Sequence, residues 1–548
     1  MHKVLLDRPI KKIKTYTGSV FNTILKFLRK YERFVKYAGL AFVSLLFAFF
    51  FFTSARPLYP ELGFGYDSYI FTAMGRQMAE GQVLYRDMFD HKGPFIFILN
   101  AIPKLFGAGI SGIWFIEVIF LFAAFIFIDK TVCLAVKKHR IPGSLLAILS
   151  FITLLCFTAD KGNLTEEYAL LPSFVSLYIF IKYIYEKPQS IKTGHGFLLG
   201  ALFSFVFLTR ANNAMFICCI VLFFIAAVIM RKQYDSLWKN ALSFLGGTFT
   251  VFIPVLIYLA ANHAIGDFLY ASFLYNVSAE KNFDAGRWSN NQFIAIVILF
   301  SVLFVAAQVV TFLNKKQGVF VGANTVRPRN DSYGRTPFAS TQALSLICII
   351  FSSITYAALI FSAFFSPYQF SHYLTNLAPA AVWYLIQILL YLDSVDFRFL
   401  LISKKIAAAA LAIFLILFMR SVYLNYCRHV KYYNDYDFKK QDNAVLELVP
   451  ENDRGSLYGY NVTPRWFATT GQTFYHKYWF QQEFFSRVNP EIKTEIEVMM
   501  RERPPKYILI QGDTQEDMII SPFLKNYYEI FAEPEGYVIY RFREMEEI

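Results

Sequence analysis

The chain has 548 residues, of which 56% are hydrophobic, 19% are aromatic and only 17% are charged. Soluble domains are about half apolar and about a quarter charged, so this composition argues against an ordinary soluble protein and points to the lipid bilayer. The formal net charge of +13 is explained by basic cytoplasmic loops, so we expect no nucleic-acid partner.

The first 37 residues form a basic segment that precedes the first apolar run. Lys and Arg are frequent in it, whereas its acids are Asp7 and Glu32. The positive-inside rule therefore predicts that residues 1–37 lie in the cytoplasm. The apolar run that follows has no small-residue cleavage site, so we expect it to stay in the protein as a membrane anchor.

Residues 38–424 are expected to form a transmembrane domain, because a bilayer-spanning helix needs about 20 predominantly apolar residues. Eleven apolar runs are candidates, at 38–55, 111–131, 143–158, 168–185, 196–210, 213–230, 241–261, 292–313, 342–365, 375–392 and 405–424. When the loops alternate from a cytoplasmic N-terminus, those assigned to the cytoplasm carry most of the Lys and Arg residues. The sequence thus predicts an α-helical polytopic membrane protein with about 11 transmembrane helices, its N-terminus inside and its C-terminus outside.

A stretch rich in ionisable residues lies between the first two spans, within residues 56–110, which this topology places outside. From Tyr66 to Met78 the apolar residues have the period of an amphipathic helix that lies in the membrane interface. Gly81 ends this helix, and "FIFILNAIPKLFG" predicts a second short apolar helix along the surface. Asp67 stands at the start of the first helix, where it either caps that helix or serves a functional site.

Other ionisable side chains fall on the same outer face, at the ends of separate helices. Charged groups near membrane depth are costly and usually face a cavity or a partner. Each also has an ordinary structural alternative, since an acid can cap a helix, an arginine can reach the headgroups and a histidine can pack among aromatic rings. Their shared face favours a functional site, and the candidates are Asp67, Asp90, His91, Lys92, Glu166, Glu167, Arg210 and His372.

Residues 425–548 differ in character from the rest of the chain. Apolar runs shorten to strand length in "KYILIQG" and "GYVIYRF", whereas "PEIKTEIEVMMRE" has helical periodicity. We expect a small extracytoplasmic α/β domain. Its Tyr and Trp side chains could stack on sugars, although such residues more often build the core of a small domain.

The order of these features resembles the GT-C membrane glycosyltransferases, in particular the bacterial relatives of protein O-mannosyltransferases and aminoarabinose transferases. The resemblance covers the whole chain and rests on "GYDSY", "YRD…HKGP", "TEEYALLP", "LTRANN", "SHYLTNLAP" and the outer C-terminal domain. It implies that a sugar moves from a polyprenyl-phosphate carrier to an acceptor at the outer membrane face, with Asp67 as base or metal ligand. Two positions depart from the family pattern: Ser68 replaces a second acid, and Gly93 interrupts the usual Lys-Pro-Pro.

The residue types also suit glycosyl transfer by a single displacement. A carboxylate is needed to accept the acceptor proton, which is the role expected of Asp67. Positive charge is needed to stabilise the departing phosphate, and Arg favours bidentate contact with it. The candidates for this second role are Arg210, Lys92, His91 and His372.

Three further acids, Glu166, Glu167 and Asp90, are candidates to support the acceptor or a metal ion. A metal is optional, because the phosphate is already a good leaving group. If a divalent cation takes part, Asp67 together with Glu167 (or Glu166) would supply oxygen ligands suited to Mg²⁺ or Mn²⁺.

We therefore expect an inverting glycosyltransferase of a bacterial cytoplasmic membrane, with its active site facing outside. Its donor would be a polyprenyl-phosphate sugar and its acceptor an envelope glycan, lipid or protein. A transporter or flippase of a lipid-linked or envelope precursor is the alternative, although transporters tend to show inverted repeats and charges at the midplane. A non-catalytic relative that binds a glycolipid is a further alternative.

Overall fold

The computed structural model describes residues 31–57, 65–137, 139–186, 191–230, 232–282, 288–289, 291–316, 341–365, 368–394, 438–512 and 518–543, with isolated positions between 416 and 427. Nine helices of this described part are long and apolar enough to cross a membrane. They are α2 (Glu32–Phe51), α5 (Ser111–Ala135), α6 (Arg140–Thr158), α7 (Thr165–Glu186), α9 (Met215–Met230) with the 3-10 turn η1 (Ala211–Ala214), α10 (Tyr234–Ala261), α13 (Asn291–Lys316), α14 (Thr341–Phe364), and α15 (Ala378–Ser394) with the 3-10 turn η3 (Ser371–Leu377).

Two of the eleven predicted spans are not among these nine. The run at 196–210 folds as α8 (Thr193–Phe207), whose 15 residues are fewer than a bilayer crossing needs. Its backbone packs directly on α10, because a Cβ added at Gly200 would lie 1.9 Å from the carbonyl oxygen of Phe244. The run at 405–424 and most of residues 1–37 lie outside the continuously described residues.

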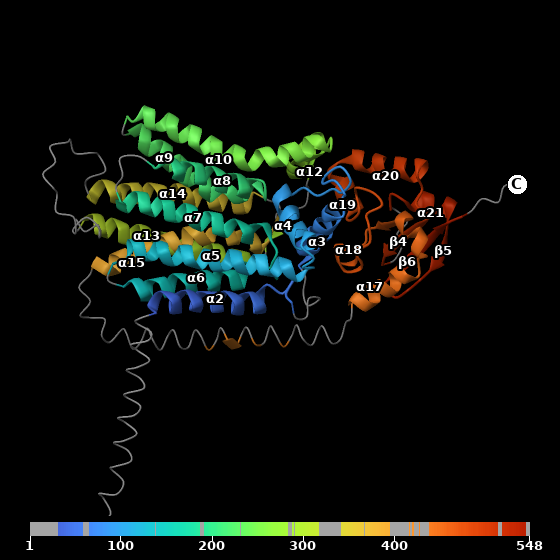
Figure 1. Cartoon of the computed structure of the whole chain (residues 1–548), viewed down its shortest axis with the longest axis horizontal. Coiled ribbons are helices and arrows are strands. Elements are labelled where there is room, and N and C mark those ends of the chain that lie inside the picture. Colours follow the sequence, from blue (N-terminus) through green and yellow to red (C-terminus); the bar gives the residue numbers. More distant parts are fainter. Residues whose placement is uncertain are drawn as a thin grey trace, which may run out of the picture.

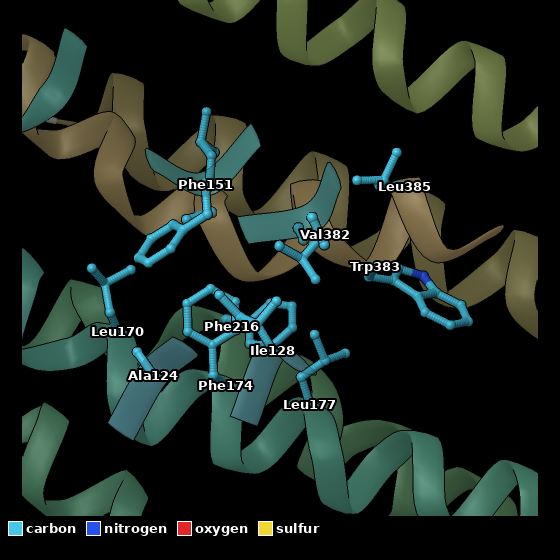
Figure 2. Close-up of a cluster of buried hydrophobic side chains, with 14 of the residues drawn as sticks. Ala124, Ile128, Phe151, Leu170, Phe174, Leu177, Phe216, Val382, Trp383 and Leu385 are labelled. Carbon is cyan, nitrogen blue, oxygen red and sulfur yellow. The ribbon is translucent and has the colours of Figure 1, made fainter. Parts of the chain in front are cut away.

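The membrane helices share one hydrophobic core. Figure 2 shows part of this core, to which Phe174 and Leu177 of α7, Ile128 of α5 and Trp383 of α15 contribute buried side chains. Burial of such side chains is worth about 1.5–3 kcal/mol each relative to exposure. α7 and α15 are the most enclosed of the nine helices, so the bundle is built around them.

The two short helices predicted between the first spans are confirmed. α3 (Tyr66–Ala79) ends just before Gly81, and α4 (Pro94–Leu105) begins with a proline, which suits the first helical position. α3 packs between α4 and α18 (Pro464–Thr470), and residues 70–75 are all buried. Neighbouring protein therefore covers much of the helix that the sequence assigns to the membrane interface.

The C-terminal part is an α/β unit, as predicted. Its sheet has the order β3-β4-β6-β5, in which β3 (Leu457–Tyr460) runs parallel to β4 (Tyr507–Gln511), while β6 (Tyr537–Phe542) is antiparallel to both β4 and β5 (Tyr528–Ala532). The helices around it are α17 (Phe438–Glu447), α18, α19 (Gln482–Val488), α20 (Pro490–Glu502) and α21 (Ser521–Tyr527), with the 3-10 turn η5 (Glu451–Ser456). Tyr458, Tyr460, Trp466 and Trp479 are buried, so these aromatic residues build the core of the unit.

This unit lies at one end of the helical bundle, with α3 and α4 between them (Figure 1). A second hydrophobic core joins α3, α4 and the C-terminal unit to α11 (Ile265–Leu269), the π-turn η2 (Tyr270–Leu274) and α12 (Tyr275–Asn282). In a separate two-stranded sheet, β1 (Trp288–Ser289) pairs in parallel with β2 (Tyr368–Gln369). The two short helices thus belong to the second core, and their loops form the floor of the candidate site.

Candidate active site

Residues far apart in the sequence meet at the end of the bundle that faces the C-terminal unit. Asp67 lies in the first turn of α3 and Lys92 in the loop before α4. Glu166 lies in the first turn of α7, and Arg210 immediately precedes η1. Ion pairs and mutual electrostatic effects connect these side chains, so the structure gathers the candidates at one site.

Lys92 lies between two carboxylates. Its Nζ is 3.9 Å from Oδ2 of Asp67 and 4.0 Å from Oδ1 of Asp90. The Lys92 side chain is almost buried, whereas that of Asp67 is 31% exposed. Asp67 therefore presents a carboxylate to an open side of the site while Lys92 approaches it from within the protein.

Backbone contacts fix the loop that carries Lys92. Gly93 N–H donates to the carbonyl of Thr209 (3.2 Å), and Phe95 N–H donates to the carbonyl of Leu208 (3.1 Å). A Cβ at position 93 would lie 2.1 Å from the Leu208 oxygen. Only glycine fits this close approach, which explains why the chain departs here from the Lys-Pro-Pro of the family it resembles.

Two side chains add to this anchoring. The Tyr85 hydroxyl donates to the Lys92 carbonyl (2.8 Å), and Asp90 Oδ1 accepts from the Lys92 N–H (2.8 Å). Tyr85 has a left-handed backbone (φ 70°) and is buried, which is uncommon for an aromatic residue. The loop that carries Lys92 bonds to Leu208 and Thr209, which directly precede Arg210. The same segment therefore holds both Lys92 and Arg210 in place.

Arg210 is fixed by a buried acid and by an aromatic ring. Its Nη1 is 2.6 Å from Oε1 of Glu166, whose other oxygen accepts from the Thr165 hydroxyl at 2.9 Å. Its guanidinium carbon lies 4.4 Å from the ring centroid of Tyr373 in η3, which is within the range of a cation–π contact. Glu166 and Tyr373 therefore fix the orientation of the Arg210 guanidinium without a ligand.

The surrounding charged side chains determine the ionisation of Asp67 and Lys92. Burial alone would raise the pKa of Asp67, but Lys92, then His372 and Arg210, outweigh it, so the pKa is lowered. Burial would lower the pKa of Lys92, but Asp67 and Asp90 raise it above its usual value. Asp67 is therefore a carboxylate at neutral pH, and Lys92 is a cation.

His91 does not supply the positive charge expected of it. Burial, then Lys92 and Arg210, lower the pKa of His91 well below its usual value, so the ring is neutral at neutral pH. Its carbonyl accepts from the Asn276 amide (3.1 Å). His91 therefore helps to hold the loop on α12, and the expectation that it acts as a phosphate-binding cation is not supported.

His372 lies among aromatic rings at the start of α15. Its imidazole is parallel to the ring of Phe370 (5.5 Å between centroids) and edge-on to that of Tyr373 (4.6 Å). This is the packing that the sequence offered as an ordinary alternative. The ring also lies close enough to lower the pKa of Asp67.

The other three acids are enclosed rather than open to an acceptor. Asp90 and Glu166 are buried against Lys92 and Arg210, respectively. Glu167 is buried as well, and its Oε2 accepts from the Leu164 N–H (3.1 Å). Of the four candidate acids, Asp67 alone has a substantially exposed side chain, so the geometry does not support acceptor contact by the others.

Comparison with solved structures identifies the fold. No protein-family model and no curated protein sequence matches the chain. ArnT from Cupriavidus metallidurans matches with TM-scores of 0.53 (bound to undecaprenyl phosphate, 13% identity) and 0.54 (apo, 11% identity), over 93% of this chain and 98% of ArnT in each case. The chain has the GT-C fold. The oligosaccharyltransferase AglB from Archaeoglobus fulgidus, in complex with an inhibitory peptide and a dolichol-phosphate, matches at TM-score 0.46 and 12% identity over 95% of this chain and 75% of that one.

Within this GT-C fold, the expected metal pair of Asp67 and Glu167 is not formed. Asp67 faces Lys92, whereas the Glu167 carboxylate lines a small cavity with Glu117, Phe120 and Tyr168. No group of three or more His, Cys, Asp or Glu side chains in the described ranges is arranged to hold a metal ion. The described residues therefore form no three-ligand protein site for Mg²⁺ or Mn²⁺.

Several residues that shape this site were not among the candidates from the sequence. Tyr373 stacks on Arg210, Tyr85 holds the Lys92 loop, and Asn163 is buried beneath α3. The Gly162-Asn163 pair is a recognisable turn signal. Tyr85 and Tyr373 lie within the motifs "YRD…HKGP" and "SHYLTNLAP", but their roles depend on partners that are distant in the chain.

Proposed function

We propose that this multi-pass membrane protein is a glycosyltransferase that moves a sugar from a polyprenyl-phosphate donor to an envelope acceptor. The observation that carries the proposal is a partly exposed carboxylate, Asp67, set beside the cation Lys92, with Arg210 at the same site. The GT-C fold supports it, since ArnT was solved with undecaprenyl phosphate bound. The proposed setting is the cytoplasmic membrane of a bacterium, with the site facing outside.

In the proposed reaction an acceptor hydroxyl oxygen attacks the anomeric carbon of the sugar. The bond from that carbon to the phosphate oxygen breaks, and its electron pair leaves with the polyprenyl phosphate. Asp67 takes the hydroxyl proton, as a general base must, from the side that is open to the acceptor. The single displacement inverts the anomeric configuration.

The cations act on the other side of the sugar. Lys92 and Arg210 would bind the phosphate and stabilise the charge that grows on it as the bond breaks. Arg210 has the planar donors suited to two phosphate oxygens, and Glu166 with Tyr373 sets their orientation. His372 lies near the same carboxylate and helps to lower the pKa of Asp67.

The test is loss of one sugar from the cell envelope. A deletion strain is complemented with the wild type, with Asp67→Asn, or with Asp87→Asn, and its glycans and lipids are compared by mass spectrometry. Asp87 is a matched control, since it lies in the same region, is similarly exposed (33%) and pairs with Arg86 outside the site. We expect the wild type and Asp87→Asn to restore the sugar and Asp67→Asn to fail despite normal expression and detergent stability.

Two results would contradict the proposal. Restoration of the sugar by Asp67→Asn would remove this carboxylate from the chemistry. Counter-transport of a labelled lipid by purified protein in liposomes, without covalent transfer, would instead identify a transporter or flippase.

A further inference from the structure

Asn163 lies in the loop between α6 and α7, beneath the candidate site. The loop makes a tight left-handed turn, with φ values of 69° at Lys161, 94° at Gly162 and 59° at Asn163. Gly and Asn tolerate this conformation better than other residues. Asn163 has no exposed surface, so its polar atoms must all find partners within the protein.

Its side chain makes every hydrogen bond that a primary amide can make. Nδ2 donates to Oγ of Ser68 (3.0 Å) and to Oδ1 of Asn100 (2.9 Å). Oδ1 accepts from Nδ2 of Asn100 (3.0 Å) and from the hydroxyl of Tyr168 (3.1 Å). Two donors and two acceptor sites are thus satisfied, which fixes the amide in one orientation.

The backbone of the same turn is held by two buried acids. The Asn163 N–H donates to Oε1 of Glu117 on α5, and the next N–H, of Leu164, donates to Oε2 of Glu167. A Cβ at Gly162 would lie 2.9 Å from Cβ of Phe52 and 2.7 Å from Oε1 of Glu117, so the turn has no room for another side chain. The position of Asn163 is therefore fixed independently of its side-chain bonds.

The partners of Asn163 lead to the elements that carry the site. Ser68 is adjacent to Asp67 on α3, and Tyr168 lies two residues beyond Glu166 on α7. Asn100 belongs to α4, whose first residue follows the Lys92-Gly93 loop. One buried amide thus connects the helix of the proposed base with the helix that orients Arg210 and with the helix that follows Lys92.

We propose that Asn163 is a positioning residue that sets Asp67 relative to Lys92 and Arg210, an inference that rests on the proposed function. It acts through Ser68, and this explains why the chain has serine where the family it resembles often has a second acid. Ser68 is completely buried, so an aspartate there would carry an unpaired charge into the network that holds α3.

The bonds that hold the cations are separate from this network. Lys92 is anchored through Gly93 and Tyr85, and Arg210 through Glu166 and Tyr373. Loss of the Ser68–Asn163 bond would therefore shift Asp67 and leave the phosphate contacts in place. Misplacement of a reacting group by 1 Å costs roughly 100-fold in rate.

The test is a double-mutant cycle on the purified full-length protein, with a labelled polyprenyl-phosphate sugar as donor. Asn163→Gly keeps the left-handed turn and the bond to Glu117 but removes the amide, while Ser68→Ala removes its partner. We expect each single variant to lower kcat by about 10- to 100-fold with the donor KM within about twofold. The double variant should be no slower than the slower single variant, because both remove the same bond.

Two further variants separate positioning from general stability. Ser68→Thr keeps a hydroxyl and should restore at least half of the wild-type kcat. Ser176→Ala, the matched control, removes an equally buried hydroxyl of α7 that bonds to its own helix at Pro172 (2.8 Å), and should leave kcat unchanged. Hydrogen exchange of residues 65–79 and 159–170 should increase in Ser68→Ala and Asn163→Gly but not in Ser176→Ala.

The outcomes distinguish this inference from the proposed function. Suppose that the wild type transfers sugar. If the losses of kcat in Ser68→Ala and Asn163→Gly are additive in the double variant, or if the variants change the donor KM instead of kcat, Asn163 does not position the base. The same conclusion follows if exchange increases while kcat stays unchanged. If the wild type transfers no sugar, the proposed function is wrong, and so is the positioning role that rests on it.

Discussion

At the scale of single residues, the site is defined by contacts that hold each charged side chain in one position. Arg210 shows this clearly, since Glu166 and Tyr373 fix it from two sides. The motif "LTRANN" identified the residue, but not its partners. The sequence could predict that Asp67, Lys92 and Arg210 share one side of the membrane, because the apolar runs and the charges of the loops between them are readable in it. It could not show that Glu167 accepts a hydrogen bond from the Leu164 N–H and lines a cavity with Glu117, because both depend on the course of one loop.

The role of the Arg210 plane can be tested with Arg210→Lys. Lysine keeps the charge but has no flat fork to contact Glu166, the Tyr373 face and a phosphate together, so we expect kcat/KM for the donor to fall by about tenfold or more. Arg86→Lys is the control, since Arg86 is an exposed arginine that pairs with Asp87 outside the site. An unchanged kcat/KM in Arg210→Lys would show that charge alone suffices.

The ionisation of Asp67 predicts the acid limb of the pH profile. Because its pKa is lowered, the carboxylate persists as pH falls past the ordinary aspartate value of about 3.9, and so does the stability that its ion pair contributes. The raised pKa of Lys92 places the loss of that cation above about 10.4. We therefore expect kcat/KM to be level between about pH 5 and 9 in the intact protein.

Lys92→Met tests the cause of this behaviour. It removes the largest charge that lowers the pKa of Asp67, so the acid limb should move to higher pH, measured with the same donor and acceptor. An acid limb that stays in place would mean that Asp67 is not the titrating base.

At the scale of elements, the short helices and their loops owe their positions to close backbone contacts. Tertiary packing explains the location of α3, whose middle is buried under α4 and α18 although its sequence has the pattern of an interfacial helix. Hydrophobic periodicity predicts that such a helix forms and which side is apolar. It does not distinguish lipid from neighbouring protein as the surface that covers it.

Gly93→Ala tests the loop that carries Lys92. The added methyl group would collide with the Leu208 carbonyl at 2.1 Å, and both backbones would have to move apart. We expect a loss of stability of about 1–3 kcal/mol, measured as thermal unfolding in detergent, and a larger relative loss of transfer. Gly194→Ala in α8 is the control, because nothing lies within 4 Å of its Cβ position and stability should not fall.

At the scale of the whole molecule, two hydrophobic cores hold together different parts of the chain. One core lies within the membrane helices and the other joins α3 and α4 to the C-terminal unit. Polar contacts add to the second core, since Gln77 Nε2 donates to the Gln472 carbonyl (3.2 Å) and Phe89 N–H donates to that of Lys477 (2.9 Å). The C-terminal unit therefore supports the floor of the site from the side opposite the bundle.

Truncation before Phe438 tests this support. It would remove most of the second core and leave the membrane core intact, so we expect the helices to remain resistant to protease while residues 65–105 become cleavable. The first cut should fall at Arg76, which in the full chain lies against Gly471. Limited trypsin digestion followed by mass spectrometry measures this, and an unchanged digestion pattern of residues 65–105 would show that the bundle alone holds α3.

The sequence by itself determined the class of the protein, most of its membrane helices, the two short helices between the first spans and the α/β character of the C-terminal unit. Hydrophobic length, periodicity and turn residues are local properties, so a single chain displays them directly. Only the tertiary structure decided that Lys92 stands between Asp67 and Asp90, that Glu166 and Tyr373 hold Arg210, and that Asn163 connects three helices. These contacts join segments separated by tens to hundreds of residues, and their geometry depends on how the helices pack, which no local pattern encodes.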